Sequence, residues 1–353
     1  MLKWGVLGTG EVAYDVAYAI NFVPNNVVRG IASRSENNAK WFAENFKDAT
    51  AYKDYDSLIQ DSDIDIIYIA TPNSTHVEMM RKCIASGKHI LVEKPFCLDV
   101  EEGREIKRLA NAANVFCMEA LWTRFIPATQ QVIESVENGR IGELRHIKGT
   151  FGHIFSKNRC FDKKLGGGVL FDLGMYLISL TYPVLGKPDR YQFMPYFGKT
   201  DVDEQASFTF SYKSGIIASF HCSFLNDLEN TIEFYGDKGI LKLGPPFYRT
   251  SRIRFDVQQA NENTNTKSVR KNPYGYPGPM QKAPYFKERL KPILPSRTNF
   301  SSIPFTGNGY HYEIMEVYDC IKNGLIESKI LPLDHSIDVV EIMNNLYASE
   351  QAS

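Results

Sequence analysis

Two periodicities of apolar residues divide the chain near residue 120. Before it, short and almost uninterrupted apolar runs, such as residues 64–70, are typical of buried strands in a parallel sheet. Between these runs, apolar residues recur along one face of each segment, which predicts helices. The strands are expected at 4–7, 27–32, 64–70, 89–92 and 115–118, and the helices at 11–22, 37–46, 77–86 and 100–113. These repeated strand–helix units predict an α/β domain with a parallel sheet and right-handed crossovers over residues 1–120.

After residue 120 the strands become longer, and apolar and polar residues alternate along them. Strands are expected at 144–155, 206–212, 216–224 and 231–235, and helices at 126–138, 169–182, 310–323 and 336–348. The turns at 213–215 and 236–239 suit hairpins. We therefore predict a second, α+β domain over residues 121–353 with a large, mostly antiparallel sheet, whose closing helices are free to pack back on the first domain.

Residues 258–308 fit no element. Six prolines lie between Pro273 and Pro295, and from Lys267 to Arg297 there are eight Lys or Arg residues but one acid, Glu288. A solvated loop and a lid or partner-binding arm both remain open for this segment.

Composition and charge exclude several classes of protein. The 353 residues are 43% hydrophobic and 23% charged, and 40 basic residues balance 41 acidic ones, for a net charge of −1. The missing basic excess argues against a nucleic-acid or membrane partner. No uninterrupted apolar stretch reaches the length of a membrane helix, and the first ten residues break at glycines, unlike a signal peptide. The six cysteines form no CxxC pair, which fits a cytoplasmic protein with reduced thiols and no metal site.

The first turn carries a dinucleotide-binding motif. GxGxxA follows the first strand directly and opens the first helix. Gly8 allows the tight turn, Gly10 lets the backbone approach a pyrophosphate, and Ala13 permits close packing of helix and strand. The helix N-terminus then offers N–H donors to the phosphates. The residues expected to contact the cofactor here are Gly8, Thr9, Gly10, Glu11 and Val12.

The end of the second strand indicates which cofactor is bound. NAD-binding proteins usually carry an acid there, whereas this chain has Ser33 and Arg34. A hydroxyl and a guanidinium suit a 2′-phosphate, so we expect NADP, with NAD as the alternative. An Arg34 that merely faces solvent is the other interpretation.

Two further loops follow central strands at their carboxyl ends, where cofactors lie in doubly wound folds. Thr71, Pro72, Asn73 and His76 are expected near the cofactor, although a local hydrogen-bonding role suits His76 better than that of a catalytic base. In the next loop we expect Glu93 and Lys94 at the same crevice. Lys94 could bind a substrate oxygen and help transfer a proton, but a lysine considered alone is more often a surface residue.

Gly166-Gly167-Gly168 leads into a helix that carries Asp172 and Tyr176. The two residues are four apart and share a helix face, so the carboxylate could orient the phenol or a substrate hydroxyl. A structural role for the pair is equally open on this evidence.

Taken in order, the motifs GxGxxA, TPNxxH, EKP, MEALWTRF, LGGGxLxDxGxY and GxGYHYEI resemble those of the Gfo/Idh/MocA oxidoreductases. The resemblance covers nearly the whole chain, apart from residues 258–308. MEALWTRF and the tyrosine at 176 are most similar to the branch of dimeric dihydrodiol dehydrogenase and NADP-dependent D-xylose dehydrogenase. The resemblance to this family implies an N-terminal Rossmann domain followed by a large, mostly antiparallel sheet.

The resemblance also implies roles for individual residues. Lys94 and Tyr176 would be catalytic, with Tyr176 exchanging a proton with the substrate while hydride moves to or from nicotinamide. A neighbouring Lys94 cation would favour the phenolate form of Tyr176. Asp172 would hold substrate hydroxyls and complete the catalytic set. Trp122 and Phe151 would face the substrate, and Arg159 would reach cofactor or substrate.

We therefore expect an NADP-dependent oxidoreductase that interconverts a hydroxyl and a carbonyl on a sugar, polyol or trans-dihydrodiol, with a sugar preferred. The alternative is a non-catalytic NAD(P)-binding regulatory or scaffold protein, which would need none of Lys94, Asp172 and Tyr176.

A homodimer or homotetramer is expected through the second sheet. One face of the strand at 216–224 looks too apolar for solvent, while Ile217, Ser219, His221 and Ser223 form a more polar face. The apolar face carries Ile216, Ala218, Phe220, Cys222 and Phe224. The pattern does not decide which face docks.

Overall fold

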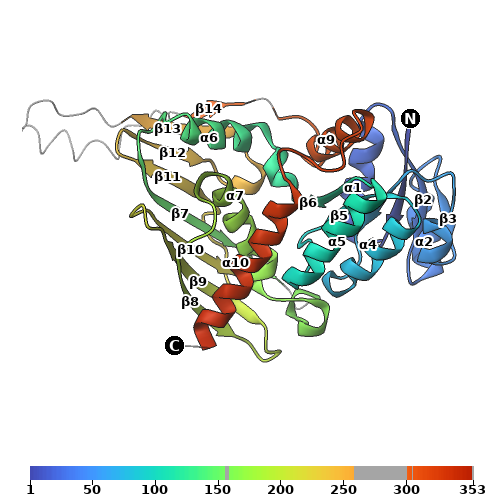
Figure 1. Ribbon diagram of the computed structural model, residues 1–353, viewed down its shortest axis with the longest axis horizontal. Helices are drawn as coiled ribbons and strands as arrows, with labels where there is room; N and C mark the ends of the chain where they lie inside the picture. The colour runs from blue at the N-terminus through green and yellow to red at the C-terminus, as the bar shows by residue number, and fades with distance from the viewer. Residues whose placement is uncertain (156–158, 258–299, 304, 352–353) are drawn as a thin grey trace, which may run out of the picture.

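Two sheets organise the chain in the computed structural model, which describes residues 1–155, 159–257, 300–303 and 305–351 (Figure 1). Within these residues, the first sheet has six parallel strands in the order β3-β2-β1-β4-β5-β6. Its strands are β1 (Leu2–Leu7), β2 (Asn26–Ala32), β3 (Thr50–Tyr52), β4 (Ile66–Ile69), β5 (His89–Glu93) and β6 (Cys117–Ala120). Its helices are α1 (Glu11–Phe22), α2 (Glu36–Ala43), α3 (Tyr55–Ile59), α4 (His76–Ala85) and α5 (Val100–Ala113). The predicted α/β fold with a parallel, doubly wound sheet is confirmed.

Burial explains why most of these elements were visible in the sequence. All four residues of β4 are buried, as a strand covered on both faces requires. Asp99 caps α5 by accepting from the N–H groups of Glu101 and Glu102 at 2.9 and 3.0 Å. The sequence analysis missed β3 and α3, because three and five residues are too few to show a period.

The second sheet has eight described strands in the order β14-β13-β12-β11-β7-β10-β9-β8. They are β7 (Leu144–Gly152), β8 (Arg190–Phe197), β9 (Asp203–Ser211), β10 (Ile217–Ser223), β11 (Ile232–Gly236), β12 (Gly239–Leu243), β13 (Arg252–Val257) and β14 (Phe300–Ser302). Every neighbouring pair is antiparallel except β7 and β10, which run parallel. Both predicted hairpins are confirmed, at β9–β10 and at β11–β12. The sequence analysis missed β8, β12, β13 and β14; most of the segment 258–308 lies outside the described residues.

Helices cover one face of this second sheet. They are α6 (Pro127–Glu137), the π-helical turn η5 (Leu170–Gly174), α7 (Met175–Leu185) and α10 (Leu333–Gln351). The apolar face of β10 (Ala218, Phe220 and Cys222) is buried on this side, where η5 contacts the strand. It therefore needs no partner, contrary to the expectation that its apolar surface calls for one. The open face carries the more polar set, including Ile217, Ser219 and His221.

The two closing helices join the halves of the molecule. The helix α9 (His311–Lys322) packs on α1, and α10 contacts α5 and β6 of the first sheet as well as α7 and β8. In Figure 1, α10 (red) runs between the two sheets. The catalytic candidates on η5 and α7 thereby face the carboxyl ends of the parallel strands.

One described segment, Lys163–Leu185, is long and apolar enough to cross a membrane by length and composition. In its most apolar window 61% is buried inside the protein. The helix α7 packs against α6, α10 and β7, so its hydropathy is that of a core helix.

Candidate active site

A cavity of about 630 Å³ opens where the carboxyl ends of β1, β2, β4 and β5 face η5 and α7. Open parallel sheets bind ligands at this edge. Predicted residues that line it are Gly8, Thr9, Gly10, Glu11, Val12, Ser33, Arg34, Thr71, Pro72, Glu93, Lys94, Trp122, Phe151, Arg159, Asp172 and Tyr176. Residues from both predicted domains thus meet in one site.

The turn after β1 is shaped to receive phosphates. Gly8 has φ +110°, and a Cβ there would lie 2.4 Å from the carbonyl oxygen of Ala70, so only glycine fits. A Cβ on Gly10 would meet no atom within 4 Å, which leaves the approach to the backbone open. Gly10 precedes α1 without a side-chain cap, so the first N–H groups of the helix are free for an anion. A dinucleotide cofactor therefore fits this turn.

The tip of β2 presents hydroxyls and a guanidinium to the same cavity. Arg34 is exposed, and Ser33, Ser35 and Asn38 line the cavity beside it. The Thr9 hydroxyl donates to the Ser33 hydroxyl at 3.2 Å, which joins this tip to the glycine-rich turn. No acidic side chain of the described residues lines this part of the cavity, as the sequence analysis expected.

Lys94 and Asp172 form a partly buried ion pair across the two halves. The Lys94 ammonium donates to the Asp172 carboxylate at 2.5 Å and to its carbonyl oxygen at 2.9 Å. The two side chains are 13% and 21% exposed. Burial raises the pKa of Asp172, but the charge and hydrogen bond of Lys94, together with the Arg159 charge and a hydrogen bond with Cys160, outweigh it, and the pKa falls below its usual value. The carboxylate therefore stays ionised and fixes the lysine at the end of β5.

Tyr176 lies beside this pair, one turn along from Asp172. The residues Leu170–Gly174 form a π-helical turn, a feature frequent at functional sites, and α7 begins at Met175. The Lys94 ammonium lies 5.1 Å from the centre of the Tyr176 ring, over its face. The predicted geometry, with Lys94, Asp172 and Tyr176 together, is present.

The protonation state of Tyr176 differs from the sequence expectation. Burial, followed by the charges of Glu93 and Asp172, raises its pKa well above the usual value, although a hydrogen bond with Trp122 opposes this. The phenolate form expected beside Lys94 is not favoured overall, because burial and the charges of Glu93 and Asp172 act against it. Tyr176 is therefore a phenol with a proton to donate.

Aromatic rings form much of the remaining wall. Phe151 meets Tyr176 edge to face at 5.5 Å and stacks on Tyr248 at 4.7 Å. Trp122 stacks on Tyr310 at 4.5 Å. Such walls favour a ligand with flat apolar faces.

Two predicted cofactor residues do not line the cavity. His76 is fully buried, and its ring nitrogens lie 2.9 Å from the Pro95 carbonyl oxygen and 3.0 Å from that of Thr71. Asn73 donates to the Gly166 carbonyl oxygen at 3.0 Å. Both side chains turn to neighbouring backbone and hold the loops together, which is the local role considered for His76.

The sequence analysis missed several lining residues. His153, Tyr248, Tyr310 and Cys160 all line the cavity. His153 could have been found, because it is two residues after Phe151 and alternation in a strand puts both on one face. Tyr248 follows no motif, and only the fold brings it to Phe151. Among the described residues no group of three His, Cys, Asp or Glu side chains could hold a metal ion.

The comparisons with known proteins agree with this geometry. Residues 2–121 match the family model "Oxidoreductase family, NAD-binding Rossmann fold", and residues 129–242 match "GFO/IDH/MocA C-terminal domain". The mouse trans-1,2-dihydrobenzene-1,2-diol dehydrogenase is 30% identical over 97% of this chain and 95% of its own. The human protein of the same name is 29% identical over 98% and 96%.

Two solved structures share the fold. A 3-ketoreductase from Actinomadura kijaniata, in complex with NADP and TDP-benzene, has a TM-score of 0.79 and 20% identity over 98% of this chain and 97% of its own. An aldose-aldose oxidoreductase from Caulobacter crescentus has a TM-score of 0.79 and 19% identity, over 99% and 98%. The chain belongs to the Gfo/Idh/MocA oxidoreductase family and is an NAD(P)-dependent dehydrogenase or reductase.

Proposed function

We propose that this Gfo/Idh/MocA oxidoreductase uses NADP to move a hydride to or from a hydroxyl or carbonyl carbon of a sugar, polyol or trans-dihydrodiol. The observation that carries the proposal is that Lys94, Asp172 and Tyr176 gather in the cavity that holds the glycine-rich turn. A protein that only bound cofactor would need none of these three side chains there.

Each of the three side chains has a distinct role in this reaction. The bound nicotinamide supplies or accepts the hydride. In the reducing direction Tyr176 donates its phenolic proton to the substrate oxygen. In the oxidising direction Tyr176 must first release that proton to solvent, and its phenolate then takes the hydroxyl proton of the substrate. The Lys94 ammonium stabilises negative charge on that oxygen, and Asp172 holds Lys94 in place.

The preference for NADP rests on the tip of β2. Arg34 offers a guanidinium to a 2′-phosphate, and Ser33 and Ser35 offer hydroxyls beside it. The one acid of the described tip residues 33–38, Glu36, pairs with Lys40 and does not line the cavity, so it is not placed to bind a ribose 2′-hydroxyl there.

The substrate class follows from the walls of the cavity. The rings of Trp122, Phe151 and Tyr248 suit the flat faces of a cyclic substrate, and Asp172 suits a second hydroxyl next to the reacting one. A sugar and a dihydrodiol both have these features. The names of the mouse and human relatives favour a dihydrodiol. The polar groups of His153, Asp172 and Tyr248 in the cavity lining favour a sugar.

A substrate panel tests the proposal. Purified enzyme with NADP⁺ is assayed by absorbance at 340 nm against aldoses, polyols and trans-dihydrodiols, and NAD⁺ is substituted in a second series. We expect turnover with one of these classes and a higher kcat/KM with NADP⁺. Cofactor binding without turnover of any of them would support the non-catalytic alternative instead.

We also propose a cytoplasmic homodimer assembled through the open face of the second sheet. Met194, Tyr196 and Ile217 are 70%, 57% and 46% exposed on this side, where no described helix covers the strands. Light scattering at micromolar concentration should give about twice the 40.1 kDa of one chain. A monomeric mass would contradict the assembly and leave the chemistry untouched.

A further inference from the structure

A second group of polar side chains reaches the same cavity but takes no part in the proton transfer described above. Its members are Tyr248, in the turn η6 (Phe247–Arg249), and His153, directly after β7. The two residues are 95 positions apart in the chain, and the His153 Nε2 atom lies 3.1 Å from the Tyr248 hydroxyl.

The ring of Tyr248 is held in place from several sides. It stacks on Phe151 with ring centres 4.7 Å apart and an interplanar angle of 20°, and it meets Trp122 edge to face at 6.4 Å. Its carbonyl oxygen accepts from the Thr123 hydroxyl at 3.2 Å. A ring fixed in this way presents its hydroxyl at one place in the cavity.

The imidazole of His153 also has partners besides Tyr248. Its Nδ1 atom lies 3.5 Å from the Asp227 carboxylate, and its Nε2 atom lies 3.3 Å from the Asn230 amide nitrogen. Asn230 is itself fixed, because its side-chain oxygen accepts from the Gly152 N–H at 2.8 Å. The Asn230 amide nitrogen can only donate, so Nε2 is the acceptor and the proton is on Nδ1, on the side of the Asp227 carboxylate.

The direction of the hydrogen bond between the two residues follows. Since Nε2 accepts, the Tyr248 hydroxyl donates to it at 3.1 Å and shares the Nε2 lone pair with the more distant Asn230 amide at 3.3 Å. The phenolic oxygen then keeps a lone pair for a donor from the cavity, and a hydroxyl group of a bound molecule can supply that donor.

We propose that Tyr248, positioned by His153, accepts a hydrogen bond from a substrate hydroxyl other than the one that reacts at Tyr176. The inference rests on the proposed function and deepens it. It makes Tyr248 a specificity-determining residue, which distinguishes a polyhydroxylated substrate from an analogue lacking one hydroxyl. His153 is then a positioning residue that acts through Tyr248.

The test is a comparison of binding, so that it does not require turnover. Cofactor fluorescence of the enzyme–NADPH complex is titrated with D-xylose and with its monodeoxy derivatives. A second series uses trans-cyclohexane-1,2-diol and cyclohexanol. The proteins are the wild type, Tyr248→Phe, His153→Phe and the double variant, with Tyr52→Phe as a control that removes a phenolic hydroxyl outside the cavity.

We expect one missing hydroxyl to weaken binding to the wild type by about tenfold or more, as for a polar partner left unpaired. Tyr248→Phe should bind the parent compound more weakly and no longer distinguish it from that analogue. His153→Phe should behave in the same way. The double variant should show no further loss of affinity, because both changes disrupt the same hydrogen bond between Tyr248 and the substrate. In turnover the effect should fall on KM rather than on kcat.

Three results would overturn the inference: a wild type that binds every analogue equally, variants that lose affinity equally for every compound, or no binding of either series. Discrimination in the wild type that Tyr248→Phe abolishes supports it even if no compound is turned over. In that case the proposed function fails while the hydroxyl-binding role of Tyr248 stands.

Discussion

Two lysines flank the same strand and have different surroundings. Lys88 precedes β5 and Lys94 follows it. The Lys88 ammonium donates to the carbonyl oxygens of Asp61 and Ile64 at 2.6 and 2.7 Å, and the residue is 8% exposed. Lys94 instead pairs with the carboxylate of Asp172 and borders the cavity. Burial alone therefore does not mark a catalytic lysine; its partners and its access to a ligand do.

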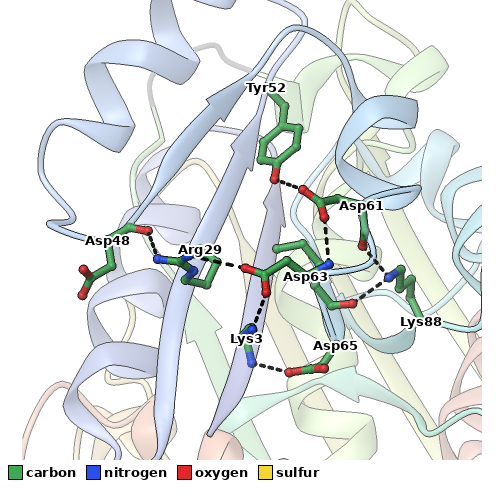
Figure 2. Close-up of polar contacts among 9 residues, drawn as sticks. Lys3, Arg29, Asp48, Tyr52, Asp61, Asp63, Asp65 and Lys88 are labelled. Atoms are coloured by element: carbon green, nitrogen blue, oxygen red, sulfur yellow. Dashed lines mark hydrogen bonds and ion pairs between the residues drawn. The ribbon is translucent and has the colours of Figure 1, made fainter.

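Lys88 belongs to a network of hydrogen bonds and ion pairs that holds the loop 61–65 in place. Figure 2 shows the loop 61–65 tied to its neighbours by Lys3, Arg29, Tyr52 and Lys88. Asp63 accepts from Lys3 and lies 3.4 Å from Arg29, and both its carboxylate oxygens are used. This network holds the entry to β4, whereas the Lys94 network leaves groups available to a substrate.

The largest expected difference between the two networks concerns their tyrosines. Tyr176→Phe keeps the ring packing and removes the proton donor, so kcat should fall by roughly 10²–10⁴, with little change in Tm or NADP affinity. Tyr52→Phe should leave kcat unchanged. Each variant is assayed for kcat with the best substrate and melted from the same preparation. A lower Tm with normal kcat for Tyr176→Phe would make that residue structural.

The lysines themselves give the next comparison. Lys94→Met removes charge and donors at the substrate, and kcat should fall by roughly 10² or more while cofactor affinity changes little. Lys88→Met removes two hydrogen bonds and leaves the buried Ile64 carbonyl group without this donor, whereas the Asp61 carbonyl oxygen keeps the Ile64 N–H at 3.3 Å. The loss should lower the free energy of unfolding by about 2 kcal/mol with normal kcat per folded enzyme. Steady-state kinetics, cofactor titration and denaturant unfolding separate the two. Normal turnover by Lys94→Met would mean that the catalytic site has been assigned to the wrong residues.

Substitutions of two arginines, Arg29 on β2 and Arg34 after it, should differ in their effect on cofactor binding. Arg34→Ala removes the expected phosphate contact, so the Kd for NADP should rise by about tenfold or more while that for NAD changes little. Arg29→Ala, whose guanidinium donates to the Asp48 carbonyl oxygen at 3.1 Å, should change neither. Both constants are measured by fluorescence titration. Equal losses for NADP and NAD in Arg34→Ala would contradict the assignment.

The smallest effect is expected at Asp63. The hydrogen bond from Lys3, and then that from Arg29, lower its pKa below 3.8. A lowered carboxyl pKa stabilises the fold above the unfolded value of 3.8, and the contribution is lost as the pH falls through the folded value. Because Asp63 is exposed, Asp63→Asn should change Tm by less than about 2 °C at pH 7, and by still less near pH 3. Thermal melts at both pH values check this, and a large loss at pH 7 would show that the network matters more than its exposure suggests.

The order of elements in the first half could be predicted because the apolar residues of most helices and strands there mark the faces that are buried. α1 begins at Glu11 and ends at Phe22, as predicted, and the strand at 64–70 was found because both its faces are covered. In β8 only Phe193 is buried, so the strand shows no alternation of apolar and polar residues, and it was missed. The site was predicted mainly through motifs and their resemblance to a family, since most of its residues lie in loops that follow the strands.

The sequence by itself determined the α/β character of the first half, the glycine-rich turn and the presence of Ser33 and Arg34 where NAD-binding proteins usually carry an acid. These properties depend on neighbouring residues only. The tertiary structure decided which of two similar lysines meets a carboxylate 78 positions away, why Tyr176 keeps its proton, and how His153 reaches Tyr248. Hydrogen bonds and pKa values depend on burial and on distant partners, and only folding creates both.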